Sequence, residues 1–285
     1  GIGIDPSKYA SLECIGKYYD ANSEATFKSA LRVVVSEALN NTTAQVNLNN
    51  EKGEPKETDV PMVFYNTKTN APMYNFLHTL NIKRNPDTLS IDPLAQYRLE
   101  VYTIPRLVKD NIKLQAGVHN TIELDAAQGF LDVKVNGGSS SFYPGLQILI
   151  KDQKTGEIIH VQQMNTTEKL LTGTYDLEIL TLPRIQMDNT VIKQSKNTMI
   201  EIPQPGNLSI RYPAQGFGCI YKMDGDTQEW VCPLNSENLI QQILLQPGKY
   251  KLVYRSDRSN RAAYTVVKDF RIASGLLTDL NLLHP

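Results

Sequence analysis

The side chains that could do chemistry are few and scattered along the 285 residues of this chain. Its 4 histidines never stand in the H-x-x-x-H or H-E-x-x-H spacing that binds metal from a helix. There is also no Gly-x-Ser-x-Gly elbow, no phosphate loop and no Cys-x-x-Cys pair. The sequence therefore predicts no catalytic residue, no metal site and no cofactor, and we expect a protein that is not an enzyme.

Two carboxylates, Glu100 and Glu178, occupy equivalent places in a repeated segment. We interpret both as charges on the solvated outer face of a sheet rather than as catalytic acids. A covalent alternative involves Glu178 as well, because Lys134 on an opening strand and Asn197 on a closing strand could be cross-linked beside an acid, as in some tandem bacterial sandwiches. A lysine that is simply exposed is the commoner explanation for Lys134.

The chain has 3 cysteines, too few for a disulfide scaffold. If Gly225 and Asp226 form a two-residue hairpin loop, the register pairs Cys219 with Cys232 at a non-hydrogen-bonded position, where the close Cα approach suits a disulfide. We predict this bridge and a free Cys14. Two reduced, buried thiols, or a longer loop that shifts the register by one, are the alternatives.

A repeated strand organises the rest of the chain. The pattern Tyr-x-Leu-x-apolar begins at Tyr97, Tyr175 and Tyr250, which are 78 and 75 residues apart. Its period of two puts the tyrosine and leucine on one buried face of a strand. Tyr175 and Tyr250, which follow turn residues, either bond their hydroxyls back to the backbone, as in a tyrosine corner, or are buried aromatics without a special bond.

The order of elements around this strand recurs three times: an opening strand, a hairpin, the Tyr-x-Leu strand and a closing strand. We therefore predict a mainly β protein of three tandem Ig-like or transthyretin-like β-sandwiches, preceded by a short α/β segment. The predicted domains are residues 1–43 for the α/β segment and residues 44–127, 128–205 and 206–285 for the sandwiches.

One amphipathic helix is predicted before the first sandwich. Its apolar residues recur at helical spacing and form one stripe over three turns. The stripe consists of Phe27, Ala30, Leu31, Val34, Val35, Ala38 and Leu39. Such a stripe cannot form a core alone, so we expect Phe27, Leu31, Val34 and Leu39 to pack on a partner or on the first sandwich.

The segments Gly1–Asp5 and Cys14–Ala21, the helix to Leu39 and the run Tyr175–Arg184 resemble the C-terminal part of von Willebrand factor A (VWA) domain proteins of the Bacteroidetes group. The resemblance implies the end of a VWA domain followed by β-sandwiches, and a role in adhesion. The Asp-x-Ser-x-Ser motif that binds the divalent metal of that family is absent, so a metal would need an upstream part of the protein. The implied partners are other proteins or that missing VWA portion.

Charge and hydropathy exclude two classes of partner. Formal net charge is −1 with both signs interspersed, so nothing indicates nucleic-acid binding. Apolar runs are far shorter than the roughly 20 residues of a membrane span. We expect a bacterial, extracytoplasmic arm for protein binding, adhesion or structure. The alternative is a carbohydrate-binding or hydrolase-accessory module that uses Tyr143, Tyr221 and Trp230, although aromatic residues of sandwiches lie in the core by default.

Overall fold

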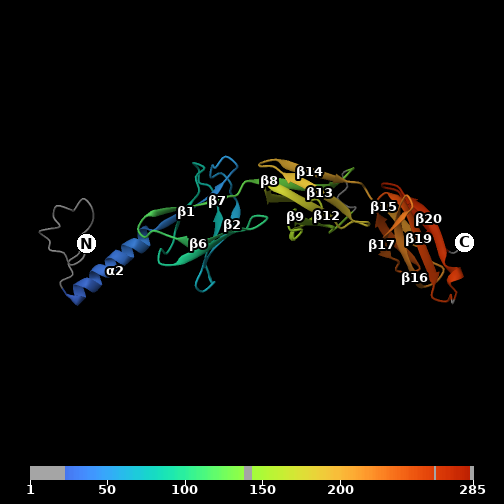
Figure 1. Cartoon of the computed structure of the whole chain (residues 1–285), viewed down its shortest axis with the longest axis horizontal. Coiled ribbons are helices and arrows are strands. Elements are labelled where there is room, and N and C mark those ends of the chain that lie inside the picture. Colours follow the sequence, from blue (N-terminus) through green and yellow to red (C-terminus); the bar gives the residue numbers. More distant parts are fainter. Residues whose placement is uncertain (1–22, 138–142, 260, 283–285) are drawn as a thin grey trace. The chain divides into compact units, whose positions relative to one another are not determined.

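The computed structural model describes residues 23–137, 143–259 and 261–282 (Figure 1). Most of the predicted α/β segment 1–43 lies outside the described residues. Its described part is helix α2 (Glu24–Asn41), which leads directly into the first strand. The helix begins with a capping box, in which the side chains of Ser23 and Thr26 each accept a hydrogen bond from the other residue's backbone N–H.

The first compact unit, Gly1–Ala127, contains the first sandwich. Its two sheets have the strand orders β4-β1-β7 and β3-β2-β5-β6. The strands are β1 (Thr43–Asn49), β2 (Val60–Asn66), β3 (Pro72–His78), β4 (Thr88–Ser90), β5 (Gln96–Val101), β6 (Leu107–Lys113) and β7 (His119–Asp125). Side chains that alternate inward from both sheets form its core, with Phe64, Tyr97 and Leu99 fully buried.

The second unit, Gln128–Pro285, contains the other two sandwiches. The second sandwich pairs sheet β11-β8-β14 with sheet β10-β9-β12-β13. Its strands are β8 (Gln128–Val135), β9 (Gln147–Asp152), β10 (Ile158–Gln163), β11 (Thr167–Leu171), β12 (Gly173–Ile179), β13 (Ile185–Ile192) and β14 (Asn197–Ile202).

The third sandwich repeats this plan with sheets β18-β15-β21 and β17-β16-β19-β20. Its strands are β15 (Gly206–Arg211), β16 (Gly216–Asp224), β17 (Thr227–Pro233), β18 (Ile240–Leu245), β19 (Gly248–Ser256), β20 (Val266–Ile272) and β21 (Leu277–Asn281), with a 3-10 turn, η2 (Ala262–Tyr264), before β20. Three sandwiches from six sheets confirm the predicted mainly β fold.

In every sandwich the first strand pairs in parallel with the last strand. β1 pairs with β7, β8 with β14 and β15 with β21. All other strand pairs within the sheets are antiparallel. Because two parallel strands run the same way, the chain enters each sandwich at one end of this pair and leaves it at the other.

The repeated tyrosine bonds its hydroxyl to the backbone in all three sandwiches. Tyr97 Oη donates to the carbonyl of Asp92 at 2.7 Å, and Tyr175 Oη donates to the carbonyl of Leu171 at 2.9 Å. In the third copy Tyr250 Oη donates to the carbonyl of Gln246 at 2.6 Å. For Tyr175 and Tyr250 these bonds match the first of the two expectations, and Tyr97 makes the same bond although none was expected there, since a buried hydroxyl needs a partner.

Replacement of Tyr250 by phenylalanine should weaken the third sandwich by about 1 kcal/mol, because the carbonyl of Gln246 loses its donor while the ring stays buried. In hydrogen exchange, amide protection in β16 and β19 should fall about fivefold. The exposed Tyr264, changed to phenylalanine, serves as the control and should leave exchange unchanged. Equal exchange rates in both variants would mean that the hydroxyl contributes nothing.

Candidate functional site

Two of the described histidines bond within the fold. Buried His78 pairs its Nε2 with the carbonyl of Val46 at 2.9 Å, and His119 Nδ1 lies 3.0 Å from the hydroxyl of Thr43. Within the described ranges, no group of three or more His, Cys, Asp or Glu residues could hold a metal ion.

The expectation that Glu100 and Glu178 lie on a solvated face is wrong, because both are buried, with 9% and 6% of their surface exposed. Glu178 accepts hydrogen bonds from Lys151 Nζ at 2.5 Å and from Arg184 at 2.6 Å. These two bonds hold the pKa of the Glu178 carboxyl below its usual value. The sequence missed this role because one of the two cations, Lys151, is distant along the chain from Glu178.

The same ion pair recurs in the first sandwich, where Glu100 binds Arg98 and Arg106, each at 3.0 Å. Both arginines also lie over tyrosine rings. Arg98 is 4.8 Å from the ring centre of Tyr65, and Arg106 is 4.3 Å from the ring centre of Tyr102. The carboxylate is thus surrounded by two cations and two aromatic rings, which explains its burial without a catalytic role.

A loop is tied down by each of these ion pairs. Thr181 Oγ1 donates to the carbonyl of Pro183 at 2.6 Å, directly before Arg184, whose guanidinium reaches back to Glu178. Thr103 makes the same 2.6 Å bond to Pro105 in the first sandwich. The repeated Glu, Thr, Pro and Arg therefore form a structural clamp between a strand and the loop that follows it.

The proposed cross-linking trio is not brought together. The parallel register of β8 and β14 places Lys134 opposite Glu201, while Asn197 lies opposite Phe130 at the other end of the ladder. Lys134 Nζ instead pairs with buried Asp132 at 2.6 Å. Glu178 lies in the other sheet, on β12. A cross-link between Lys134 and Asn197 is therefore not supported by this geometry.

The hairpin register predicted at the cysteines is wrong. A β-bulge between Ile220 and Tyr221 shifts the ladder by one, so that Cys219 faces Pro233 and Cys232 faces Ile220. Cys232 joins the core beside Ile220, where burial raises the pKa of its thiol to about 11. Both thiols are free in the structure. In this register the two cysteines are not cross-strand partners, so the structure does not support the predicted bridge, which would require a different register.

The three aromatic residues of the carbohydrate alternative divide into two groups. Tyr143 is buried, and its hydroxyl accepts a 2.8 Å hydrogen bond from Gln246 Nε2. Tyr221 and Trp230 are direct cross-strand partners beyond the bulge, as predicted, but Trp230 is 58% exposed. The expectation that sandwich aromatics lie in the core therefore fails for Trp230.

The apolar stripe of helix α2 remains largely exposed. Phe27, Leu31 and Val34 have 45%, 44% and 37% of their surface accessible, although Ala30 between them is buried. Packing on the first sandwich, one of the two expectations, therefore does not cover these three side chains. The side chain of Leu39 lies outside the described residues.

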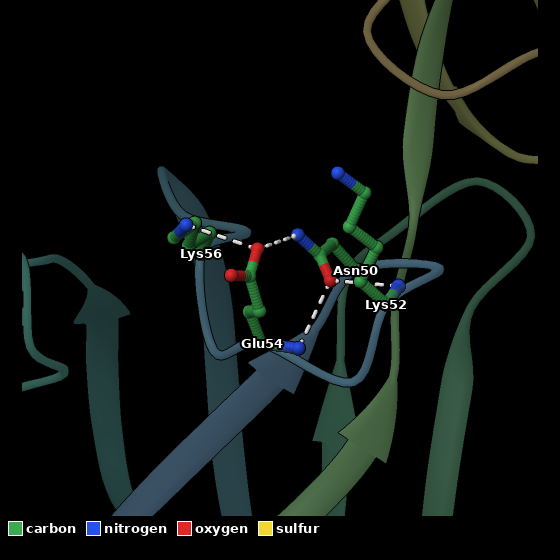
Figure 2. A network of polar contacts seen from close by, with 4 residues as sticks. All are labelled: Asn50, Lys52, Glu54 and Lys56. Carbon is green, nitrogen blue, oxygen red and sulfur yellow. Dashed lines mark hydrogen bonds and ion pairs between the residues drawn. The ribbon is translucent and has the colours of Figure 1, made fainter.

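A polar network shapes the turn between β1 and β2 (Figure 2). Asn50 Oδ1 accepts the backbone N–H groups of Lys52 and Glu54, each at 2.9 Å. Its amide donates to Glu54 Oε2 at 3.0 Å, and Lys56 Nζ binds the same oxygen at 2.9 Å. The hydrogen bond from Asn50, followed by that from Lys56, lowers the pKa of Glu54. All the hydrogen bonds drawn in Figure 2 close within this turn, so we interpret the network as structural.

No protein-family model and no curated protein matches this sequence. Among solved structures, the TIE protein of Bacillus anthracis matches with 17% identity and a TM-score of 0.23, over 84% of this chain and 50% of that chain. A minor pilin of Streptococcus agalactiae matches with 12% identity and a TM-score of 0.30, over 55% and 94%. A streptococcal ancillary pilin matches with 10% identity and a TM-score of 0.29, over 84% and 98%.

The chain thus spans half the length of the TIE protein structure. Likeness at these TM-scores carries no argument about function. Tandem sandwiches, the coarser part of the predicted resemblance, are present. The VWA segment and a Bacteroidetes origin stay predictions. None of the described helices is long and apolar enough to cross a bilayer.

Replacement of Glu178 by glutamine should destabilise the second sandwich by about 1–2 kcal/mol at neutral pH, because Lys151 and Arg184 lose their charge partner while both are partly solvated. A carboxyl with a lowered folded pKa contributes stability above its unfolded pKa of about 4.3 and loses it as pH falls through the folded value. The difference from wild type should therefore shrink in acid. Hydrogen exchange of β12 amides measures it, with exposed Glu157→Gln as the control.

Thiol titration under denaturant should find 3 reactive cysteines, because the bulge places Cys219 and Cys232 out of register. In the folded protein Cys232 should react far more slowly than Cys219, since it is buried and its pKa is raised. A single reactive thiol under denaturant would instead establish the bridge.

Proposed function

We propose that this chain is a non-enzymatic structural arm of a bacterial extracytoplasmic protein, which transmits tension between attached parts and binds other proteins through exposed surfaces. The parallel pairing of the first and last strands of each sandwich carries the proposal. A device that must resist pulling needs its strongest hydrogen-bonded ladder between the two points where force enters and leaves.

In each sandwich, force from the preceding chain pulls the first strand backwards along its axis. Force from the following chain pulls the last strand forwards. Because the two strands are parallel neighbours, these forces slide one past the other and load all ladder hydrogen bonds together. The ladders comprise 7, 6 and 5 residue pairs in the first, second and third sandwich.

Other observations agree with an arm that binds rather than reacts. The buried carboxylates Glu100 and Glu178 are occupied by ion pairs, and His78 and His119 bond within the fold. We propose that the helix face made by Phe27, Leu31 and Val34 is covered by another protein or by a VWA portion of the same protein. A carbohydrate-binding function is the second candidate, because Tyr221 and Trp230 lie side by side and Trp230 is exposed.

Single-molecule pulling of the whole chain through its two ends tests the proposal. We expect three separate high-force events, one for each sandwich. A second sample is pulled across the third sandwich alone, through the substitutions Asn207→Cys and Leu277→Cys, and this arrangement is called the matched geometry. In both samples Cys14, Cys219 and Cys232 are changed to serine. These two positions are register partners, so force there opens the ladder one pair at a time.

The third sandwich should therefore rupture at a clearly lower force in the matched geometry than in the end-to-end geometry. Equal rupture forces in the two geometries, or end-to-end events as weak as those of an opening hairpin, would contradict a role in transmitting tension.

A further inference from the structure

The outer face of sheet β17-β16-β19-β20 in the third sandwich combines exposed aromatic rings with cations. Alternation along the strands assigns the face, because Tyr250, Leu252 and Tyr254 point into the core and the residues between them point outward. We infer that this face is a docking surface for an acidic, aromatic-containing segment of a protein partner. The inference rests on the proposed protein-binding role and gives it a site.

Strands β16 and β17 supply the aromatic half of this face. Tyr221 lies directly opposite Trp230. Phe217 stands four residues before Tyr221 on β16, on the same side of the strand. Phe217 is 73% exposed and Trp230 is 58% exposed. Single exposed apolar residues are normal, but Trp and Tyr are enriched where protein interfaces derive most of their binding energy.

Strands β19 and β20 supply the cationic half. The outward residues of β19 include Lys249, Lys251 and Arg255, and those of β20 include Arg271. On the four strands, all of which are described, these four cations share the outer face with one carboxylate, Asp269, which lies 3.8 Å from Lys251. The whole chain has a net charge of −1, so the excess of positive charge is local to this face.

The two halves are joined row by row. Trp230, Tyr221 and Lys251 form one continuous cross-strand row, and Phe217 lies opposite Arg255 in another. Neighbouring strands are about 4.8 Å apart, so Tyr221 and Phe217 each lie one strand spacing from a cation, and Trp230 lies two strand spacings from Lys251. A partner that fits must present apolar or aromatic side chains directly beside carboxylates.

This requirement selects the chemistry of the partner. A polyanion without apolar groups would use only the β19 and β20 half and leave Phe217 and Trp230 in water. An acidic peptide with aromatic residues uses both halves, because its carboxylates meet the lysines and arginines while its rings cover the aromatic residues. The third sandwich differs here from the others, since Val253 stands where they carry the clamped glutamate.

The chain has a single tryptophan, Trp230, so tryptophan fluorescence reports occupancy of this face directly. The whole chain is titrated with a random copolymer of glutamate and tyrosine, with polyglutamate and with hyaluronate, under excitation selective for tryptophan. We expect the copolymer to shift the emission of Trp230 to shorter wavelength. Its affinity should exceed that of polyglutamate about tenfold and fall with rising salt.

Two variants on the face should each weaken copolymer binding about tenfold. One is the double variant Lys249→Glu and Arg255→Glu, and the other is the single variant Phe217→Ser. Matched changes of exposed residues off the face, Lys154→Glu and Tyr264→Ser, should leave it unchanged. Circular dichroism confirms that each variant is folded.

Three results would overturn the inference: no emission shift with the copolymer, equal affinity for polyglutamate, or binding that survives the variants on the face. Hyaluronate binding of equal strength that is lost in the same variants would reassign the face to an anionic polysaccharide. The pulling experiment does not depend on this face, so the tension-bearing role and the docking surface can fail separately.

Discussion

The parallel hydrogen-bonded ladder between the first and last strands of each sandwich is the constraint on which the rest of the structure depends. It joins the two ends of each sandwich, so that the three-stranded sheet of the first, second or third sandwich is complete only when both end strands are in place. It also fixes the entry and exit of the chain at opposite ends of the ladder. Every other strand lies between these two points and serves to hold them in place.

The Tyr-x-Leu strand provides the opposing layer. Its tyrosine and leucine fill the space under the ladder, and the tyrosine hydroxyl satisfies a carbonyl four or five residues earlier, where the chain enters the strand. In the first two sandwiches the residue after the leucine is a glutamate, Glu100 or Glu178. Its ion pair with Arg106 or Arg184 adds a second attachment on the outer face. A buried carboxylate with two cations is costly to assemble but costly to break, which restrains the loop it holds.

The third sandwich lacks this clamp. Val253 replaces the glutamate, and no Pro-Arg pair follows it in the sequence. The outer face that the clamp occupies elsewhere instead displays Trp230, Phe217 and four cations. One scaffold thus has two uses of the same sheet face, internal restraint in the first two copies and an exposed surface in the third.

The sequence by itself determined the repeat, the number of sandwiches and the buried strand, because the period-two pattern at Tyr97, Tyr175 and Tyr250 depends only on neighbouring residues. It also determined the pairing of Tyr221 with Trp230, since a two-residue loop fixes the register close to the turn. Tertiary structure decided the rest. The bulge after Ile220 moved Cys232 away from Cys219, and Lys151, distant along the chain, buried Glu178. Burial and register far from a turn depend on which strands become neighbours, and the pattern within one strand carries no information about that choice.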